Sequence, residues 1–223
     1  MSSDIKHTDA VIAIVYHSGY GHTARQAEAV RRGVEKVPGA AVLFLKSDEA
    51  QARFSALEGA DAIIFGAPTY MGSASGPFKT FMDATSQVFV SGAWRDKIAA
   101  GFTNSGSRAG DKLLTLIEFN ILAAQLGMHW VSLGMLPGNN RSDGSENDLN
   151  RLVFFLGAAA QSNTDEGSEI APPASDLRTA EALGERVARV TQQSIRGRLA
   201  RVEGSSFAVE PALALAEEAE VAA

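Results

Sequence analysis

The stretch VIAIVYHSGYGHT, residues 11–23, joins an apolar run to a short polar loop that contains two glycines. The apolar run, 11–16, is typical of a parallel strand that is buried on both faces. A helical period begins at Thr23 and places Ala27 and Val30 on one face. A strand that leads through a glycine-bearing turn into a helix N-terminus presents backbone N–H groups to an anion. We therefore predict that this loop binds a phosphate group.

Further short apolar segments follow along the chain, and helical periods separate them. We expect strands at residues 11–16, 41–45, 62–66, 98–102 and 128–133. Hairpin signals are lacking between these segments. The alternation predicts an α/β fold with a five-stranded parallel sheet and helices on both faces.

For two helices, the sequence predicts which residues face the core. The helix at 111–126 is expected to bury Leu113, Leu114, Ile117, Ile121 and Leu122. The final helix is expected over about 175–195, with Leu177, Ala180, Leu183, Val187 and Val190 facing inward.

The segment 137–173 interrupts the alternation of strands and helices. It begins with glycine and asparagine residues, ends in two prolines, and contains an apolar stretch at 149–155 that is compatible with a short helix. A long irregular excursion in a compact domain usually has a function or forms an interface. We expect a single domain over 8–196, followed by a tail, 197–223, that is loosely helical or disordered.

The composition narrows the class of protein. With 223 residues, 45% of them hydrophobic, the chain is long enough for one sizeable core. Its net charge of −6 argues against a surface that binds nucleic acid. It has no cysteine, so disulfides and thiolate sites are excluded. The four histidines lack the spacing of metal ligands, and no metal is expected.

The sequence shows no signal for export or membrane insertion. The first ten residues, MSSDIKHTDA, are polar and unlike a signal peptide. No apolar stretch approaches the roughly 20 residues that a membrane span requires. We expect a cytoplasmic protein without a membrane span.

Three loops, after the first, third and fourth strands, are rich in glycine and hydroxyl-bearing residues. They cover residues 18–23, 68–73 and 104–110. The carboxyl ends of parallel strands meet at one edge of a sheet, and ligands bind there where the strand order reverses. In the strand order 2-1-3-4-5 these three strands are neighbours. We therefore expect the three loops to surround one site.

Two interpretations of the first loop remain open from its residues alone. GYGHTA, residues 19–24, matches the dinucleotide fingerprint GxGxxG/A. That interpretation needs an acidic residue after the second strand, and Asp48 is a candidate. The alternative is that Ser18 and Thr23 bracket a single terminal phosphate, which also gives the other two loops a role. A turn of this kind also occurs in α/β proteins without any phosphate.

The motifs SGYGHT (18–23), GAPTYMGSASGPFKTFMD (66–83) and FTNSGSRAG (102–110) resemble those of the WrbA-type NAD(P)H:quinone oxidoreductases. The resemblance covers residues 11–133, and its most specific parts are GAPTYMG and the FMDAT that follows it. It implies a flavodoxin-like three-layer sandwich with the strand order 2-1-3-4-5. It also implies non-covalent FMN and a homo-oligomer, a tetramer or a dimer, whose neighbouring subunits help to wall the site.

The same resemblance implies roles for individual residues. The FMN phosphate would be held by Ser18, Tyr20, Gly21, His22 and Thr23. The isoalloxazine would be lined by Pro68, Thr69, Tyr70, Met71, Gly72 and Ser73. The pyrimidine edge would be covered by Asn104, Ser105, Gly106, Ser107, Arg108, Ala109 and Gly110. Tyr20 and Phe89 are expected to contact the substrate, and Leu126 stands where such enzymes often have a histidine near the flavin. No catalytic side chain is assigned, because the flavin carries the chemistry.

The expected activity is hydride transfer from NAD(P)H to FMN and then to a quinone or a similar two-electron acceptor, in a ping-pong scheme. An electron carrier without NAD(P)H activity is the first alternative, and the acidic charge suits a carrier that docks on a basic partner. A reductase that supplies reduced FMN to a partner monooxygenase is the second. The long excursion favours the enzyme, because it offers material for a substrate wall or a subunit contact.

Overall fold

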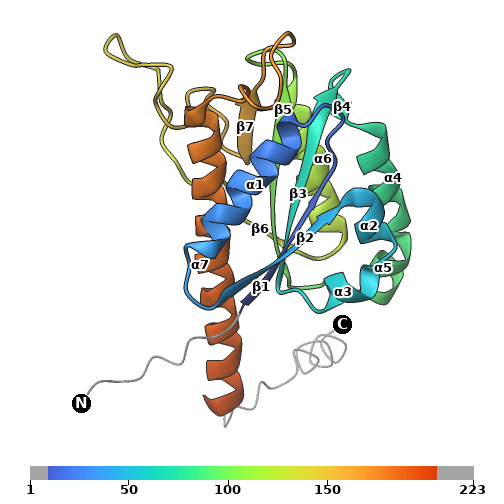
Figure 1. The fold of residues 1–223 in the computed structure, drawn as a ribbon. Coiled ribbons are helices and arrows are strands. Elements are labelled where there is room, and N and C mark those ends of the chain that lie inside the picture. The colour runs from blue at the N-terminus through green and yellow to red at the C-terminus, as the bar shows by residue number, and fades with distance from the viewer. Residues whose placement is uncertain (1–9, 205–223) are drawn as a thin grey trace, which may run out of the picture.

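A computed structural model describes residues 10–204 and shows a twisted parallel sheet between two layers of helices (Figure 1). The sheet order is β2-β1-β3-β5-β6, which confirms the predicted order 2-1-3-4-5. Its strands are β1 (Ala10–Tyr16), β2 (Ala40–Lys46), β3 (Ala62–Tyr70), β5 (Ile98–Ser105) and β6 (His129–Trp130). Two short strands extend it: β4 (Ser73–Ala74) pairs antiparallel with β3, and β7 (Ala158–Gln161) pairs parallel with β5.

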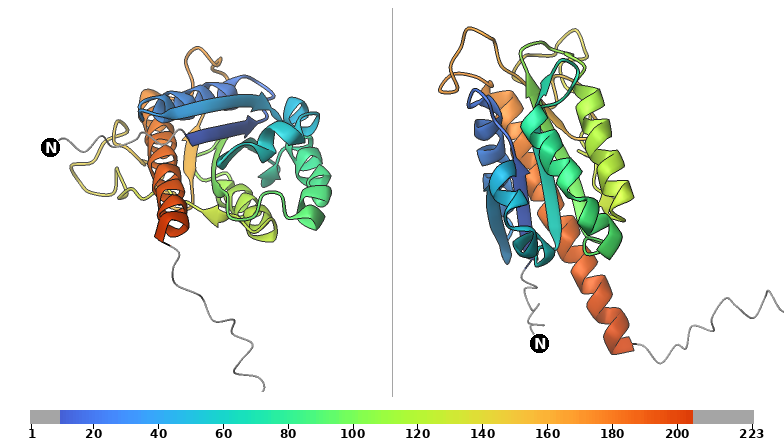
Figure 2. Two further views of the ribbon diagram at one scale, coloured as in Figure 1. Left: turned by 90° about the horizontal axis from the view of Figure 1, so that it is seen from below. Right: turned by 90° about the vertical axis from the view of Figure 1, so that its right-hand side faces the viewer.

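The helices divide between the two faces of the sheet, as the right-hand view of Figure 2 shows. One face carries α1 (His22–Glu35) and α7 (Ala174–Gly204), and the other carries α2 (Ser47–Gln51), α3 (Phe54–Glu58), α4 (Gly76–Ala84), α5 (Ser86–Ser91) and α6 (Lys112–Gln125). Successive side chains of a strand point to opposite faces. In β1, Ile12 and Ile14 accordingly join the core under α1 and α7, while Ala13 and Val15 join the other core. Each strand thus serves both cores, as its apolar run predicted.

The predicted fifth strand at 128–133 is wrong in its extent. Only His129 and Trp130 pair with β5, and they do so at its N-terminal end. The chain then leaves the sheet and returns as β7, which pairs with the C-terminal half of β5. The indole N–H of Trp130 donates to the Leu156 carbonyl at 2.9 Å and closes this detour. The segment 137–173, expected to be irregular, therefore contains one strand of the sheet, and the compatible helix at 149–155 is absent there.

The expectation for the inner face of α6 is also wrong. Leu113, Leu114, Ile117 and Ile121 are between 37% and 52% exposed, and only Leu122 of the predicted set is buried. Leu116, Phe119 and Ala123 face the core instead. The cause is that α6 is apolar on two faces, so its periodicity does not distinguish the inner face from the outer one. We call the four exposed residues the α6 stripe.

Helix α7 confirms the predicted inner face and is longer than expected. Ala180, Leu183 and Val187 are fully buried, and Leu177 and Val190 pack against the same core. The helix continues past the expected end near 195 to Gly204, so the first part of the tail is helical. The rest of the tail lies outside the described residues. Within 10–204, no helix combines the length and apolar character that crossing a bilayer demands.

Helices α1 and α7 approach each other through two glycines. A Cβ on Gly184 would lie 2.0 Å from the Val30 carbonyl oxygen, and one on Gly33 would lie 1.9 Å from the Glu181 carbonyl oxygen. We expect Gly184→Ala to lower the free energy of unfolding by about 1–3 kcal/mol, because the backbone must move apart. Gly197→Ala in the same helix is the control: it meets no atom within 4 Å and should gain up to about 1 kcal/mol from helix propensity. Urea denaturation measures both, and equal effects of the two variants would contradict the close packing.

Candidate functional site

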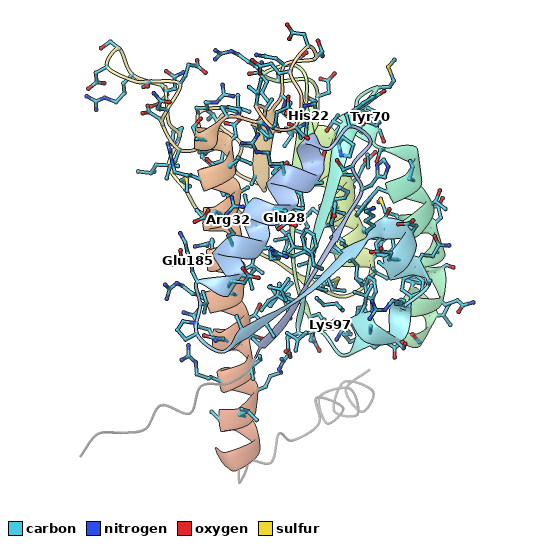
Figure 3. All side chains as sticks on the ribbon, in the orientation of Figure 1. His22, Glu28, Arg32, Tyr70, Lys97 and Glu185 are labelled. Atoms are coloured by element: carbon cyan, nitrogen blue, oxygen red, sulfur yellow. The ribbon has the colours of Figure 1, made fainter. Side chains whose placement is uncertain are left out.

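A cavity of about 640 Å³ opens at the edge of the sheet where β1, β3, β5 and β7 end. Figure 3 shows His22 and Tyr70 at this edge and Lys97 at the opposite end of the molecule. The cavity is lined by Tyr20, His22, Thr23, Pro68, Thr69, Tyr70, Asn104, Ser105, Gly106, Ser162, Thr164, Glu166 and Gly167. Residues from all three predicted loops therefore meet around one cavity, and a fourth segment, 162–167, joins them.

The remaining predicted residues lie beside the cavity or away from it. Ser18 and Gly21 border a neighbouring hollow of about 390 Å³ on the β2 side of the first loop. Arg108 lines a different hollow, which it shares with Glu146 and Arg151. The other predicted site residues of the three loops that do not line the cavity are Met71, Gly72, Ser73, Ser107, Ala109 and Gly110. Phe89, on α5, faces a shallow groove with Leu126 and does not reach the cavity within one chain.

The first loop has the backbone and the donors that an anion site requires. Gly21 adopts φ +88° immediately before α1, a conformation that favours glycine. The Ser18 hydroxyl oxygen is buried and has no hydrogen-bond partner among the described residues. Thr23 is buried in the first turn of α1, where free backbone N–H groups and the helix dipole favour negative charge. An unpaired buried hydroxyl is costly, so its presence here indicates a ligand that supplies the partner.

The segment after β7 is tied to the first loop from the other side of the cavity. His22 donates from Nε2 to the Glu166 carbonyl at 2.8 Å, and this bond sets the proton on that nitrogen. Arg25 donates to the Ser168 carbonyl at 2.5 Å. Sequence reasoning missed this segment because it lies inside the irregular excursion. The one local cue is weak: small polar residues follow AAAQ at 158–161, as they follow the other strands, but alanine has little preference for a strand.

A chain of threonine hydroxyls joins β3, β5 and α6 behind the cavity, and Thr69 is the member that lines it. Thr69 Oγ1 lies 2.8 Å from both Thr103 Oγ1 and Thr115 Oγ1, and Thr103 donates to the Ala67 carbonyl at 2.7 Å. All three side chains are buried. Their mutual hydrogen bonds satisfy the buried hydroxyls and hold the ends of β3 and β5 at a fixed spacing.

The second loop is held by two groups outside it. Glu118 of α6 accepts from the Ser73 hydroxyl at 2.7 Å and from the Ala74 backbone N–H at 2.8 Å. Tyr70 reaches across to the backbone of Gly19, and burial raises the pKa of its hydroxyl, so it is neutral at physiological pH. Tyr20 meets Tyr70 edge to face at 6.3 Å and is largely exposed at the rim of the cavity. A ligand that enters the cavity therefore passes two aromatic side chains.

The third loop is held by a lysine that sequence reasoning did not single out. Lys112 donates to the Ser105 hydroxyl at 2.7 Å and also to the Ser107 carbonyl. Asn104 accepts from the Ser162 hydroxyl at 2.8 Å, which joins this loop to the segment after β7. Arg108 points away from the cavity and pairs with Glu146 at 2.5 Å. The cation that lies under the third loop is thus Lys112 and not Arg108.

Comparisons with known proteins agree with this geometry. Residues 42–141 match the family model described as NADPH-dependent FMN reductase. The chain is 44% identical to Flavodoxin FldP of Pseudomonas aeruginosa over 182 residues, which cover 81% of this chain and 96% of that protein. It is 33% identical to an NAD(P)H dehydrogenase (quinone) of Geotalea uraniireducens, covering 85% of this chain and 99% of that protein.

A solved structure carries the same arrangement. The flavodoxin, WrbA-like protein from Agrobacterium tumefaciens is 40% identical, with a TM-score of 0.65 and coverage of 83% of this chain and 99% of that chain. The strand order, the loops that meet at one cavity and these relatives lead to one assignment. The chain belongs to the flavodoxin-like family of WrbA-type NAD(P)H:quinone oxidoreductases.

Proposed function

We propose that this protein binds FMN without covalent attachment and transfers a hydride from NAD(P)H to FMN and on to a quinone or a similar two-electron acceptor. The observation that carries the proposal is the buried Ser18 hydroxyl, which has no partner among the described residues and lies in the loop before α1, next to the cavity bordered by three glycine- and hydroxyl-rich loops. The family supports the same cofactor. A terminal phosphate at Ser18 and Thr23 gives the orphaned hydroxyl its partner.

Each of the three loops is assigned one part of FMN. The phosphate is held by Ser18, Tyr20, Gly21, His22 and Thr23. The isoalloxazine is lined by Pro68, Thr69, Tyr70, Met71, Gly72 and Ser73. Its pyrimidine edge is covered by Asn104, Ser105, Gly106, Ser107, Ala109 and Gly110. Arg108 belongs to the same proposed set, although its side chain pairs with Glu146 at the border of a different hollow.

When bound, FMN supplies the two-electron redox chemistry, and the protein supplies position and electrostatics. The threonine hydroxyls hold the ends of β3 and β5, and Glu118 holds β4 at the end of the second loop, so these loops are in place before the cofactor binds. Tyr20 stands exposed at the rim and is placed to contact an incoming nicotinamide. One open cavity serves nicotinamide and quinone in turn, which is the basis of the ping-pong scheme.

The test of this function combines a spectrum with steady-state kinetics. The purified full-length protein is expected to show flavin absorption bands, either directly or after loading with FMN. It is expected to oxidise NADH or NADPH in the presence of benzoquinone, with parallel lines in double-reciprocal plots. Loaded protein that shows no turnover with either nucleotide would refute the enzymatic proposal.

A flavodoxin-like electron carrier is the second candidate. It is favoured by the 44% identity to Flavodoxin FldP and by the acidic charge of the chain. A carrier would retain FMN and exchange electrons with a partner protein but would not oxidise NAD(P)H by itself. The match to the FMN reductase family favours a third candidate, a reductase that releases reduced FMN. Tight retention of the reduced cofactor would count against this third function.

We further propose that the protein is a cytoplasmic homo-oligomer, a tetramer or a dimer. The α6 stripe, Leu113, Leu114, Ile117 and Ile121, is an apolar helix face without a partner among the described residues. Exposed apolar patches of this kind mark association surfaces. Phe89 and Leu126 share a groove that is separate from the proposed FMN cavity of the same chain. Phe89 can therefore contact a substrate only at the cavity of a second subunit.

Changing the α6 stripe tests the oligomer. We expect Ile117→Asp to convert the assembly to monomers, because a carboxylate in the centre of an apolar contact would be buried without a partner. Sedimentation velocity measures the assembly, and circular dichroism checks that the fold is retained. Leu136→Asp makes the same kind of change at an exposed leucine just before the excursion and should leave the assembly intact. A monomeric wild type, or an oligomeric Ile117→Asp variant, would contradict the proposal.

A further inference from the structure

Lys112 is an unusual residue in this protein because its side chain is completely buried, with 0% exposure. It is the first residue of α6, directly after the third loop. Both of the hydrogen bonds that its ammonium group donates end on that loop, at the Ser105 hydroxyl and the Ser107 carbonyl. Ser105 in turn lines the cavity. The lysine thus lies directly beneath the loop that covers the proposed flavin site.

The charges around Lys112 do not neutralise it. In the described part of the chain, no carboxylate lies within 4.0 Å of its ammonium group. Asp176, the buried carboxylate nearby, is already paired with Arg151 at 2.8 Å through both of its oxygens and also accepts from the Gln161 backbone N–H. Arg151 pairs with Asp176 and also with the half-exposed Glu146, so neither carboxylate serves Lys112 as a counterion.

Burial of a lysine without a counterion has a cost that the fold does not explain. Burial lowers the pKa of Lys112 to about 8, an effect that Asp176 opposes and Arg151 strengthens. At pH 7 the group is still mostly protonated, so the charge is present. Ionisable groups whose pKa is shifted by burial tend to occur at functional sites, where a ligand can supply the opposite charge. An anionic ligand in the cavity that Ser105 lines would provide such compensation.

We propose that Lys112 is a positioning residue for the flavin: it fixes the loop 105–107 over the pyrimidine edge, and its charge favours the two-electron-reduced, anionic form of FMN over the oxidised form. This inference rests on FMN as the cofactor. Two-electron reduction places negative charge at the pyrimidine end of a flavin, which is where the resemblance puts this loop. Oriented charge in a partly dry site stabilises developing negative charge strongly.

The test compares two lysines that are both desolvated but lie at opposite ends of the sheet. Lys112→Met removes the charge beneath the cavity. Lys97→Met is the matched control, because Lys97 also donates to two carbonyls, of Glu58 and Ala60, and burial also lowers its pKa. Figure 3 shows Lys97 far from the cavity edge. For each variant, the Kd of oxidised FMN, the midpoint potential of the bound FMN and the thermal stability of the apo-protein are measured.

Lys112→Met is expected to reduce the preference for reduced over oxidised FMN by about tenfold, which equals a midpoint potential about 30 mV more negative for a two-electron couple. The apo-protein should lose some stability, because the Ser105 hydroxyl and the Ser107 carbonyl lose their donor. Lys97→Met should lower the apo stability and leave the potential unchanged. A destabilised Lys112→Met variant with an unchanged potential would show a purely structural role and overturn the inference.

The failure of this inference can be told apart from failure of the proposed function. A wild-type protein that does not bind FMN would overturn both. A wild type that binds FMN but does not oxidise NAD(P)H would refute only the enzymatic activity. In that case the potential of the Lys112→Met variant still supports or overturns the role of Lys112, because it is measured without turnover.

Discussion

Replacing Arg151 by methionine is expected to lower the free energy of unfolding by about 3–5 kcal/mol, the largest single effect that we predict for this chain. Arg151 and Asp176 form a two-pronged ion pair at 2.8 Å, and their side chains are only 5% and 2% exposed. Methionine fills a similar volume but leaves the Asp176 carboxylate buried without its cation. The pair joins the excursion to α7, and Asp176 also accepts from the Gln161 backbone N–H in β7 at 2.9 Å.

Two further variants separate loss of the pair from loss of an arginine. In Arg151→Met/Asp176→Asn, the asparagine is neutral and its carbonyl still accepts from Gln161, so we expect most of the lost stability to return. Arg141→Met removes an arginine from the exposed pair with Asp143 and should change the stability by less than about 1 kcal/mol. Chemical denaturation measures all three. An Arg151→Met variant as stable as Arg141→Met would contradict the buried pair.

The Arg151–Asp176 pair also supports the cavity. Gln161 ends β7, and the next residues, 162–167, line the cavity. Glu146 accepts a further hydrogen bond from Arg151 and pairs with Arg108, so the same network reaches the third loop. We therefore expect Arg151→Met to weaken FMN binding as well as the fold.

The sequence predicts a strand where one continuous apolar segment of the chain forms it. The strands β1, β3 and β5 each contain a continuous apolar run that a polar loop follows, so both their burial and their loops could be inferred. The fifth strand could not, because its two halves, β6 and β7, are separated by the excursion and β7 is AAAQ. Alanine has little preference for a strand, and only the pairing with β5 makes it one.

The site residues that sequence reasoning missed depend on contacts between distant segments. The pairing of Arg151 with Asp176, the bond from His22 to Glu166 and the bond from Ser73 to Glu118 each join residues that no local pattern connects. Lys112 looks like an ordinary polar residue at the start of a helix. Its burial follows only from the way the third loop closes over it. Resemblance to a family indicated the loops but not the groups that hold them.

The second large effect is expected at the first loop, where Ser18→Ala and Thr23→Val remove the two hydroxyls that bracket the proposed phosphate. Each should weaken FMN binding by about 1–3 kcal/mol, or roughly 5- to 150-fold in Kd, and the double variant by more. The effects on the apo-protein should differ. Ser18→Ala removes a buried hydroxyl that has no partner, so the apo-protein should keep or gain stability.

Weaker FMN binding without a loss of apo stability distinguishes a binding hydroxyl from a structural one. Removal of a hydroxyl that stabilises the fold would lower the stability of the apo-protein. Thr80→Val is the matched control, since Thr80 is exposed on α4 and bonds only to the Gly76 carbonyl of its own helix. Fluorescence titration of the apo-protein with FMN gives the Kd, and thermal melts without FMN give the stability. Unchanged Kd values in both loop variants would remove the phosphate from this loop. A shift confined to Thr23→Val would place the phosphate toward the helix and away from Ser18.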